Sequence, residues 1–189
     1  WEGSKPNANI ELVAREARYN LLFDFCKKNN IKTILLAHQK DEQAETFLLR
    51  LARGSGVYGL SAMKEVNYRQ NIALVRPLLD FSKKQLINYN KSVNQEWVED
   101  SSNQNEAFER VKIRKFLPKL KDISIFLDTL TKTASRMQRA AEALEFYAQA
   151  LIKENVVFYD EGYAKVNWDK ILNAPEEISL KTIANLVQI

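Results

Sequence analysis

A short apolar run, from Thr33 to Ala37, lies between two segments whose apolar residues recur every three or four positions. These segments, 9–30 and 41–53, have the spacing of amphipathic helices, and the run between them predicts a strand. Because the run is apolar without alternation, we expect helices to cover both of its faces. Helix, covered strand and helix in this order predict an α/β fold with a parallel sheet and flanking helices.

Local signals place the remaining elements. We expect mostly loop over 54–71, a strand over 72–75, and a helix from the capping box of Ser82 and Gln85 to about residue 93. Further expected elements are a short edge strand at 96–99, a helix at 106–117, one long helix or two abutting helices at 124–154, a hairpin within 156–166, and a helical pair at 168–188. A boundary near 120–125 separates an α/β domain, 1–120, from a smaller and mainly helical region, 121–189.

Composition narrows the class of protein. The chain has 189 residues, 28 Lys and Arg against 24 Asp and Glu, and a formal net charge of +4. A single cysteine, Cys26, excludes a disulfide framework and a Cys-rich zinc or iron–sulfur site within this chain, and fits a reducing compartment such as the cytoplasm. The apolar runs are too short to span a membrane, and we expect no signal peptide. The small basic excess is compatible with a nucleic-acid partner without requiring one.

The residues after the predicted strand are the strongest candidates for chemistry. His38, Asp41, Glu42 and Glu45 lie where a strand gives way to a helix, the place where ligands bind in open α/β sheets. The helix N-terminus suits an anion, and His38 can hydrogen-bond or exchange a proton near neutral pH. Glu42 and Glu45 share one helical face and could hold an ammonium group or Mg²⁺. The alternative is structural, because acidic residues stabilise a helix N-terminus by about 0.3–1 kcal/mol each.

A second cluster combines Arg53 with the turn Gly54-Ser55-Gly56. Guanidinium and backbone donors beside such a turn could receive a phosphate. The alternative is a helix C-cap with its usual basic residues, and Gly54 stands where a left-handed residue is expected.

Arg15 and Arg18 form a third cluster, because residues three apart are adjacent on a helix surface. They could reach a nucleotide phosphate. The alternative is a pair of salt bridges with Glu11 or Glu16.

The fourth cluster is a basic segment with no acidic residue between Arg110 and Lys121. Arg110 and Arg114 share a helical face, and Lys112 and Lys115 add charge to the segment. Such a face could track a phosphate backbone. The alternative is an ordinary solvated surface.

The ordered motifs resemble those of the tRNA(Ile)-lysidine synthetases, a family of N-type PP-loop ATPases. The resemblance covers residues 1–120 closely and 121–189 far less specifically, and it implies a partial Rossmann-like PP-loop ATPase fold. It rests on five segments in the family's order and spacing: Ala14 to Tyr19, His38 to Met63, Arg76 to Leu79, Trp97 to Asn103, and Arg110 to Arg114.

The resemblance implies a ligase that modifies tRNA(Ile) with a CAU anticodon, using ATP and Mg²⁺. ATP adenylates the C2 oxygen of the wobble cytidine, an amine of free L-lysine attacks C2, and AMP leaves. The implied catalytic residues are His38, Asp41, Glu42 and Glu45, with Glu42 and Glu45 at the lysine amine or the magnesium ion. The implied nucleotide contacts are Arg15, Arg18, Arg53, Gly54, Ser55 and Gly56, and the implied tRNA contacts are Arg110, Lys112, Arg114 and Lys115.

The chain departs from the family pattern in two places. The Ser-Gly-Gly-x-Asp-Ser phosphate loop does not occur in it, and Glu42 stands where the family has the second Asp of its His-x-x-Asp-Asp pattern. The chain also begins with Trp1 rather than Met. We therefore expect the later part of a longer enzyme that is inactive alone. We also expect poor independent stability, or aggregation through an exposed sheet edge.

Two other functions stay open. One is a related PP-loop enzyme such as a tRNA thiolase, although thiolases with an iron–sulfur cluster need cysteine pairs. The other is a non-catalytic tRNA-binding module. The expected partners are tRNA(Ile) and free L-lysine, with no membrane, and a homodimer stays open as an alternative to a monomer.

Overall fold

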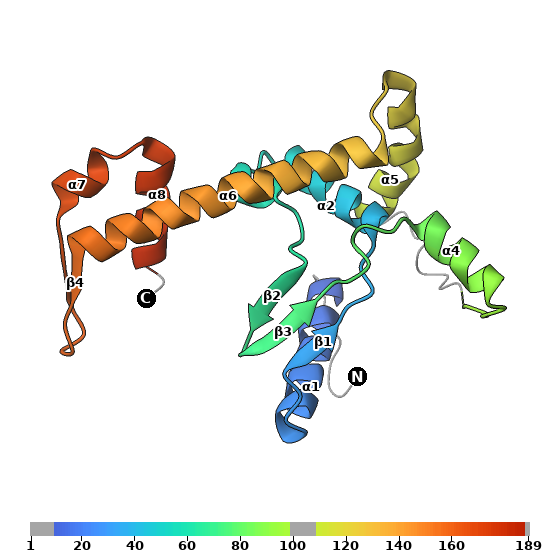
Figure 1. Ribbon diagram of the computed structural model, residues 1–189, viewed down its shortest axis with the longest axis horizontal. Coiled ribbons are helices and arrows are strands. Elements are labelled where there is room, and N and C mark those ends of the chain that lie inside the picture. Colours follow the sequence, from blue (N-terminus) through green and yellow to red (C-terminus); the bar gives the residue numbers. More distant parts are fainter. Residues whose placement is uncertain (1–9, 99–108, 188–189) are drawn as a thin grey trace. The chain divides into compact units, whose positions relative to one another are not determined.

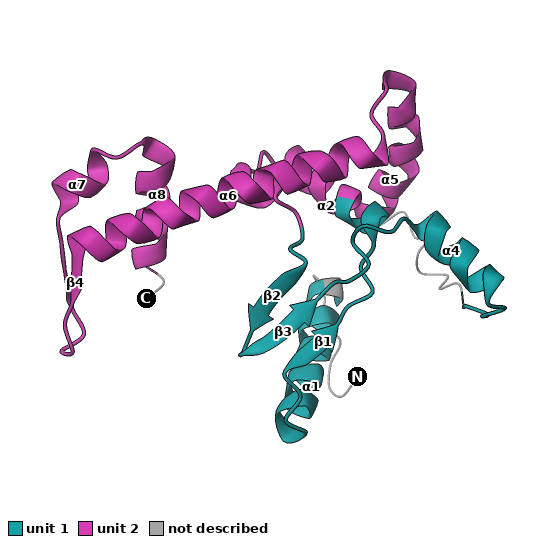
Figure 2. Ribbon diagram, in the orientation of Figure 1, with its two compact units in different colours: residues 1–43, 63–99 teal, residues 44–62, 100–189 magenta. Residues whose placement is uncertain are grey.

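The computed structural model describes residues 10–98 and 109–187. The chain divides into two compact units, residues 1–43 with 63–99 and residues 44–62 with 100–189 (Figure 2). The division runs through helix α2, Lys40–Ala52, whose residues 40–43 belong to the first unit. The domain boundary expected near 120–125 stays a prediction.

Three strands organise the first unit: β1 (Thr33–Leu35), β2 (Val66–Arg69) and β3 (Ile72–Val75), in the order β1-β3-β2. β1 runs parallel to β3, with Ile34 opposite Leu74, and β2 runs antiparallel to β3 (Figure 1). Helix α1, Ile10–Lys28, packs on the sheet through a shared core of Tyr19, Phe23, Cys26, Ile72 and Leu74. The expected α/β fold with parallel strands is confirmed, and the sheet adds an antiparallel strand.

β1 lies at the edge of this sheet, and its two faces differ. Ile34 and Leu36 pack against the α1 core, whereas Leu35 points to the opposite face and is 70% exposed. The expectation that helices cover both faces of this strand is therefore wrong for the described residues. The reason is that α1 covers one face, while the other helix of the unit, α4 (Lys83–Ser92), has no buried residue.

The segment 54–71, expected to be mostly loop, contains a short helix, α3 (Val57–Leu60), and strand β2. β2 and β3 form a hairpin whose turn residues, Gln70 and Asn71, have φ angles of 51° and 63°. Two successive left-handed residues are typical of the tight turn whose twist matches a hairpin. The sequence signal is weak because glutamine is uncommon in that conformation.

Helix α4 begins as the sequence predicts. The Gln85 amide donates to Ser82 Oγ at 3.3 Å, and the Ser82 amide donates to Gln85 Oε1 at 2.9 Å, so the capping box is confirmed. Residues 96–98 form no strand, so the expected edge strand at 96–99 is wrong over its described part.

The second unit is organised by α6 (Leu127–Asn155), which is one continuous helix. Its N-terminal half packs against α2, where Leu130 and Ala134 share a core with Ala44, Phe47 and Leu120. Helix α5 (Glu109–Phe116) and the 3-10 helix η2 (Leu117–Ile123) precede it in the chain.

The C-terminal half of α6 carries a further core. Strands β4 (Val156–Phe158) and β5 (Ala164–Val166) form an antiparallel hairpin, followed by α7 (Trp168–Leu172) and α8 (Glu176–Leu186). Ile152, Val156 and Ile171 are buried together. The expected hairpin and final helical pair are confirmed. Over residues 10–98 and 109–187, no helix is both long enough and apolar enough to cross a membrane.

Candidate functional site

The carboxyl ends of the parallel strands β1 and β3 meet at one edge of the sheet, and a side chain able to hydrogen-bond follows each. His38 comes after β1 and Arg76 comes directly after β3. The buried Arg76 guanidinium donates through Nε to Nδ1 of His38 at 3.2 Å, and through Nη1 to the Lys64 carbonyl at 2.9 Å. Burial lowers the pKa of Arg76, yet a guanidinium stays protonated in proteins.

This contact decides how His38 can act. Because a guanidinium only donates, Nδ1 of His38 must accept, and the ring proton of the neutral imidazole lies on Nε2. Sequence reasoning named Arg76 as part of a motif but not as a site residue. The signal was available, since an arginine at the carboxyl end of a strand parallel to β1 lies at the ligand-binding edge.

Side-chain hydrogen bonds close the first turn of α2. Glu42 Oε2 accepts from the Gln39 amide at 3.1 Å, and Gln39 Oε1 accepts from the Asp41 amide at 2.9 Å. The Asp41 carboxylate accepts from the Lys83 amide at 2.8 Å, so it caps the first turn of α4. Asp41 and Glu42 thus have the structural roles that the alternative interpretation described. Their catalytic roles stay predictions.

In the second unit, Glu45 forms a bidentate ion pair with Arg114. Arg114 Nε lies 2.7 Å from Glu45 Oε1, and Nη2 lies 3.2 Å from Oε2. Glu45 is 1% exposed, whereas the Arg114 side chain is 38% exposed. A carboxylate this deeply buried needs a charged partner, because an unpaired charge in the interior is strongly destabilising. Arg114, expected at the tRNA, therefore directs its guanidinium toward α2.

The contacts of Glu42 and Glu45 bear on the expected magnesium site. One Glu42 oxygen accepts from the backbone, and both Glu45 oxygens accept from Arg114. A magnesium ion at Glu45 would compete with the guanidinium for the same oxygens, so these residues do not form a ready magnesium site. The described residues also bring together no group of three His, Cys, Asp or Glu that could hold a metal ion. The magnesium assignment stays a prediction.

The turn after α2 has the geometry of a helix C-cap. Gly54 has a φ of 67°, and the Ser55 amide donates to the Arg50 carbonyl at 3.0 Å. Arg53 is exposed and pairs with Glu109 on α5. The expected left-handed conformation of Gly54 is confirmed. Phosphate binding by Arg53, Gly54, Ser55 and Gly56 stays a prediction.

The two arginines of α1 are exposed. Glu16 pairs with Arg69, whose Nη2 lies 2.5 Å from Glu16 Oε2, and this hydrogen bond lowers the pKa of Glu16. The alternative that Arg15 or Arg18 forms a salt bridge with Glu16 is therefore wrong, and the side chain of Glu11 lies outside the described residues. A nucleotide contact of Arg15 and Arg18 stays a prediction.

Helix α5 carries the four residues expected at the tRNA. Lys112 and Lys115 are exposed, Arg110 is half-buried, and Arg114 pairs with Glu45. The buried side chain of α5 is Val111, which anchors the helix. Residues 99–108, which hold part of the motif from Trp97 to Asn103, lie outside the described residues.

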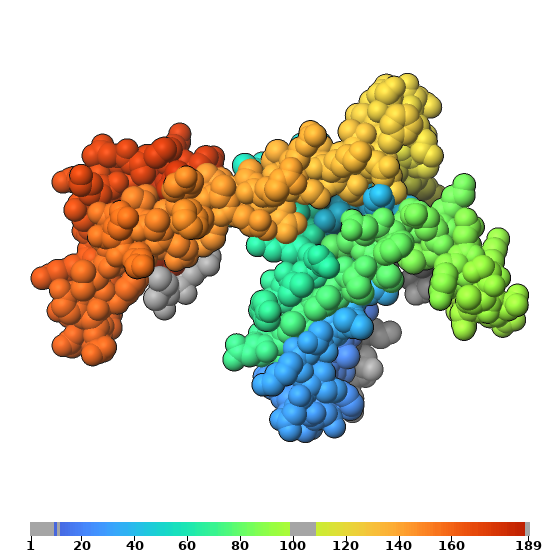
Figure 3. All heavy atoms as spheres, viewed as in Figure 1, coloured from blue at the N-terminus to red at the C-terminus, as the bar shows by residue number. Residues whose placement is uncertain are grey.

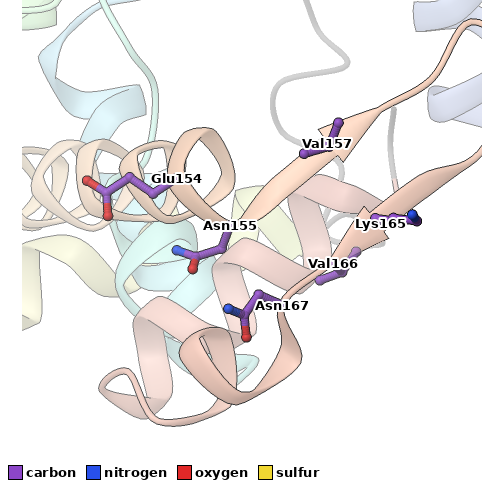
Figure 4. A pocket seen from close by; sticks show the side chains of 6 residues that line it. All are labelled: Glu154, Asn155, Val157, Lys165, Val166 and Asn167. Carbon is purple, nitrogen blue, oxygen red and sulfur yellow. The ribbon is translucent and has the colours of Figure 1, made fainter.

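A pocket lies where the end of α6 meets the β4–β5 hairpin (Figure 4). It is lined by Glu154, Asn155, Val157, Lys165, Val166 and Asn167. None of the residues predicted from the sequence lines it, so it contributes nothing to the candidate site.

A family model described as a PP-loop domain matches residues 2–120. The match covers more than half of the chain, so the chain belongs to the PP-loop domain family. The strand pair β1 and β3 lies within the matched residues.

Three curated relatives are similar over nearly the whole chain, and each is named tRNA(Ile)-lysidine synthase. The protein of Wolbachia pipientis wMel is 42% identical over 183 residues, which is 97% of this chain and 42% of the relative. That of Wolbachia sp. subsp. Brugia malayi is 35% identical over 189 residues, 100% of this chain and 44% of the relative. That of Ruegeria pomeroyi is 35% identical over 187 residues, which is 99% of this chain and 44% of the relative. The chain thus spans about two fifths of the length of these relatives.

Proposed function

We propose that this chain forms part of a cytoplasmic ligase that joins lysine to C2 of the wobble cytidine in tRNA(Ile) with a CAU anticodon. The observation that carries the proposal is the similarity of 97–100% of the chain to proteins named tRNA(Ile)-lysidine synthase. Membership of the PP-loop domain family supports ATP as the source of activation.

The proposed reaction has two steps. The C2 oxygen of the cytidine attacks the α-phosphorus of ATP, and pyrophosphate leaves. An amine of lysine then attacks C2, the bond from C2 to the adenylate oxygen breaks, and AMP leaves as the amine loses a proton. Hydrogen-bond donors beside the phosphates and a carboxylate beside the amine would stabilise the charges that develop. Mg²⁺ would neutralise the ATP phosphates.

His38 and Glu45 would serve the reacting groups. His38, whose Nδ1 accepts from Arg76, would act as a hydrogen-bond donor through Nε2 toward an anionic oxygen, since ligands of such sheets bind at this edge. Glu45 would hold the lysine amine, which would share the carboxylate oxygens with the guanidinium of Arg114. Arg114 would position Glu45 for that role, because two hydrogen bonds from its guanidinium orient the buried carboxylate.

The exposed cations would contact the polyanionic substrates. Lys112 and Lys115 on α5, with Arg110, would bind tRNA phosphates. The helix end with Arg53, and Arg15 with Arg18 on α1, would contact the nucleotide.

The test measures lysidine in an unmodified CAU-anticodon transcript incubated with ATP, lysine and the full-length protein that carries this chain. Digestion to nucleosides and mass spectrometry detect the product. Glu45→Gln keeps the shape of the side chain but removes its charge, and we expect product formation to fall at least about 100-fold. Glu161→Gln, at an exposed hairpin position, is the matched control and should react as the wild type.

The outcomes separate two failures. No lysidine from the wild-type protein with wild-type substrates would overturn the proposed function. Full activity of a folded Glu45→Gln variant, with a melting temperature near that of the wild type, would remove only the role given to Glu45.

A further inference from the structure

The outward face of α6 carries three cations followed by two aromatic rings. Lys132, Arg136 and Arg139 recur at spacings of four and three residues, and Phe146 and Tyr147 follow on the same face. With 3.6 residues per turn, these five side chains fall within an arc of about 100°. We call these five residues the α6 stripe.

The packing of the unit leaves the α6 stripe in solvent. The buried side chains of α6 fall within an arc of about 40°, centred opposite the stripe; they are Leu130, Ala134, Ala141, Ala148 and Ile152. All five stripe residues are exposed, with Phe146 at 70% and Tyr147 at 56%. Atoms of α6, coloured orange, are visible at the surface in the space-filling view (Figure 3).

The three cations of the α6 stripe repel one another along the helix. Like charges four residues apart destabilise a helix by about 0.2–0.5 kcal/mol per pair. Among the ion pairs of the described residues, none includes Lys132, Arg136 or Arg139. Two exposed acidic residues lie near the stripe: Glu142, which accepts a hydrogen bond from Gln138, and Asp128, four residues before Lys132. The three cations of the stripe are therefore held by no ion pair of the described residues, and they outnumber the two nearby carboxylates.

The two rings add a second kind of contact. Phe146 and Tyr147 meet edge to face, with their centroids 5.5 Å apart. Exposed ring faces accept an unstacked base, and every base has a face that can stack. An acidic protein surface would complement the cations but would leave the rings without a specific partner. RNA supplies both phosphates and bases.

We propose that the α6 stripe is an RNA-binding surface. Lys132, Arg136 and Arg139 bind phosphates, and Phe146 and Tyr147 stack on an unpaired base. From Lys132 to Tyr147 the stripe is about 22 Å long. The choice of tRNA as the RNA rests on the proposed function, and the inference extends its RNA contacts from α5 to the long helix of the same unit.

The experiment titrates a fluorescent CAU-anticodon tRNA(Ile) transcript with the full-length protein that carries this chain and follows anisotropy at several salt concentrations. A variant combining K132Q, R136Q and R139Q should bind about 10–100-fold more weakly, with a salt dependence shallower by about 2–3 ions. A variant combining F146L and Y147L should lose about tenfold in affinity with an unchanged salt dependence.

The matched control combines K153Q, K165Q and K170Q, which removes the same charge from three other exposed lysines of the second unit. It should change affinity by less than about threefold, the effect of net charge alone. Circular dichroism checks that each variant is folded.

Three results would overturn the inference. In the first, the variant combining K132Q, R136Q and R139Q binds tRNA like the wild type, while the variant combining R110Q and K112Q binds tRNA weakly. The proposed tRNA substrate then stands without the stripe. In the second, the variant combining K132Q, R136Q and R139Q changes self-association measured by light scattering but does not change RNA binding. That result would make this face a contact with a second copy of the same protein. In the third, the wild-type protein binds no tRNA, and the lysidine assay then decides separately on the proposed function.

Discussion

The guanidinium of Arg76 donates from Nε to Nδ1 of His38 across 3.2 Å, joining the ends of two parallel strands. The same guanidinium reaches the Lys64 carbonyl, and the Arg76 amide donates to the Glu65 carbonyl at 2.8 Å. Arg76 thus ties the segment before β2 to the sheet edge where His38 lies. Arg76 thereby sets the tautomer of His38, the one histidine in the chain.

The tautomer of His38 is a direct test of this relationship. Because the chain has a single histidine, its two imidazole nitrogen signals in ¹⁵N NMR are assigned without ambiguity. We expect the neutral ring to carry its proton on Nε2. In Arg76→Met both signals should move toward the average of the two tautomers, because the donor that selects Nδ1 as acceptor is gone.

Arg69→Met serves as the control, since Arg69, on strand β2 of the same sheet, contacts Glu16 of α1 and not the histidine. A proton on Nδ1 in the wild type, or signals that do not change in Arg76→Met, would show that Arg76 does not set the tautomer.

The Glu45–Arg114 pair predicts a large loss of stability when one partner is removed. Arg114→Ala should lower the free energy of unfolding by about 2–4 kcal/mol, because it leaves a buried carboxylate without its charged partner. The lower part of that range reflects the partial exposure of Arg114. Urea denaturation followed by circular dichroism measures the change.

Arg53→Ala is matched to this variant, since it removes an arginine from an exposed ion pair with Glu109. It should cost at most about 1 kcal/mol. Equal losses in the two variants would contradict the special role of the buried pair.

Glu145 predicts a pH dependence of stability. Burial raises its pKa, but hydrogen bonds from Gln149 and Lys181 outweigh burial, with Lys181 Nζ at 3.0 Å, and the pKa lies below its usual value. Because the pKa of Glu145 is lowered in the folded state, its ionised carboxylate contributes fully to the free energy of unfolding at pH values above the usual pKa of a glutamate. It is lost as the pH falls through the lower pKa of the folded state.

Thermal melts across the acidic range measure this effect. Glu145→Gln should lower the free energy of unfolding by up to about 1 kcal/mol near pH 7, since the carboxylate is partly exposed. It should also make the fall in melting temperature at acidic pH less steep. Glu161→Gln, at an exposed position, should keep the wild-type profile. If the melting temperature falls equally steeply at acidic pH in Glu145→Gln and in the wild type, protonation of Glu145 is not the cause.

The exposed edge of β1 predicts aggregation of the isolated chain. Leu35 is 70% exposed on an edge strand, and such strands pair with other chains. Leu35→Lys should reduce light scattering on heating without lowering the melting temperature. Leu21→Lys, at an equally exposed position on α1, should reduce scattering less, because a helix offers no free strand edge. A cooperative melt of the wild type with no aggregation would contradict the expectation.

Local patterns in the sequence determined most of the secondary structure. The helical spacing of α1 and α2, the capping box of Ser82, the left-handed Gly54 and the hairpin before α7 depend on residues within a few positions of each other. Such signals are set by backbone geometry and neighbouring side chains, so they survive any tertiary arrangement. The β2–β3 hairpin was missed because its turn residues, Gln70 and Asn71, are a weak signal for two left-handed conformations.

The acidic motif shows the limit of spacing arguments. The sequence placed Glu42 and Glu45 one turn apart on one helix, and this is correct. It did not show that Glu42 closes the first turn of α2 while Glu45 is buried against an arginine. Spacing fixes which face of a helix a residue shares, but burial and charge partners come from the segments that pack on that face.

The sequence alone therefore determined where helices and strands form, and which residues gather at the start of α2. Only the tertiary structure decided that Arg114, 69 positions away in the chain, neutralises Glu45, that Arg76 sets the hydrogen bonding of His38, and that one face of β1 lies in solvent. The physical reason is distance along the chain: element formation depends on neighbours within a few residues. Ion pairing and burial depend on which remote segments meet, and the packing of the whole chain settles that.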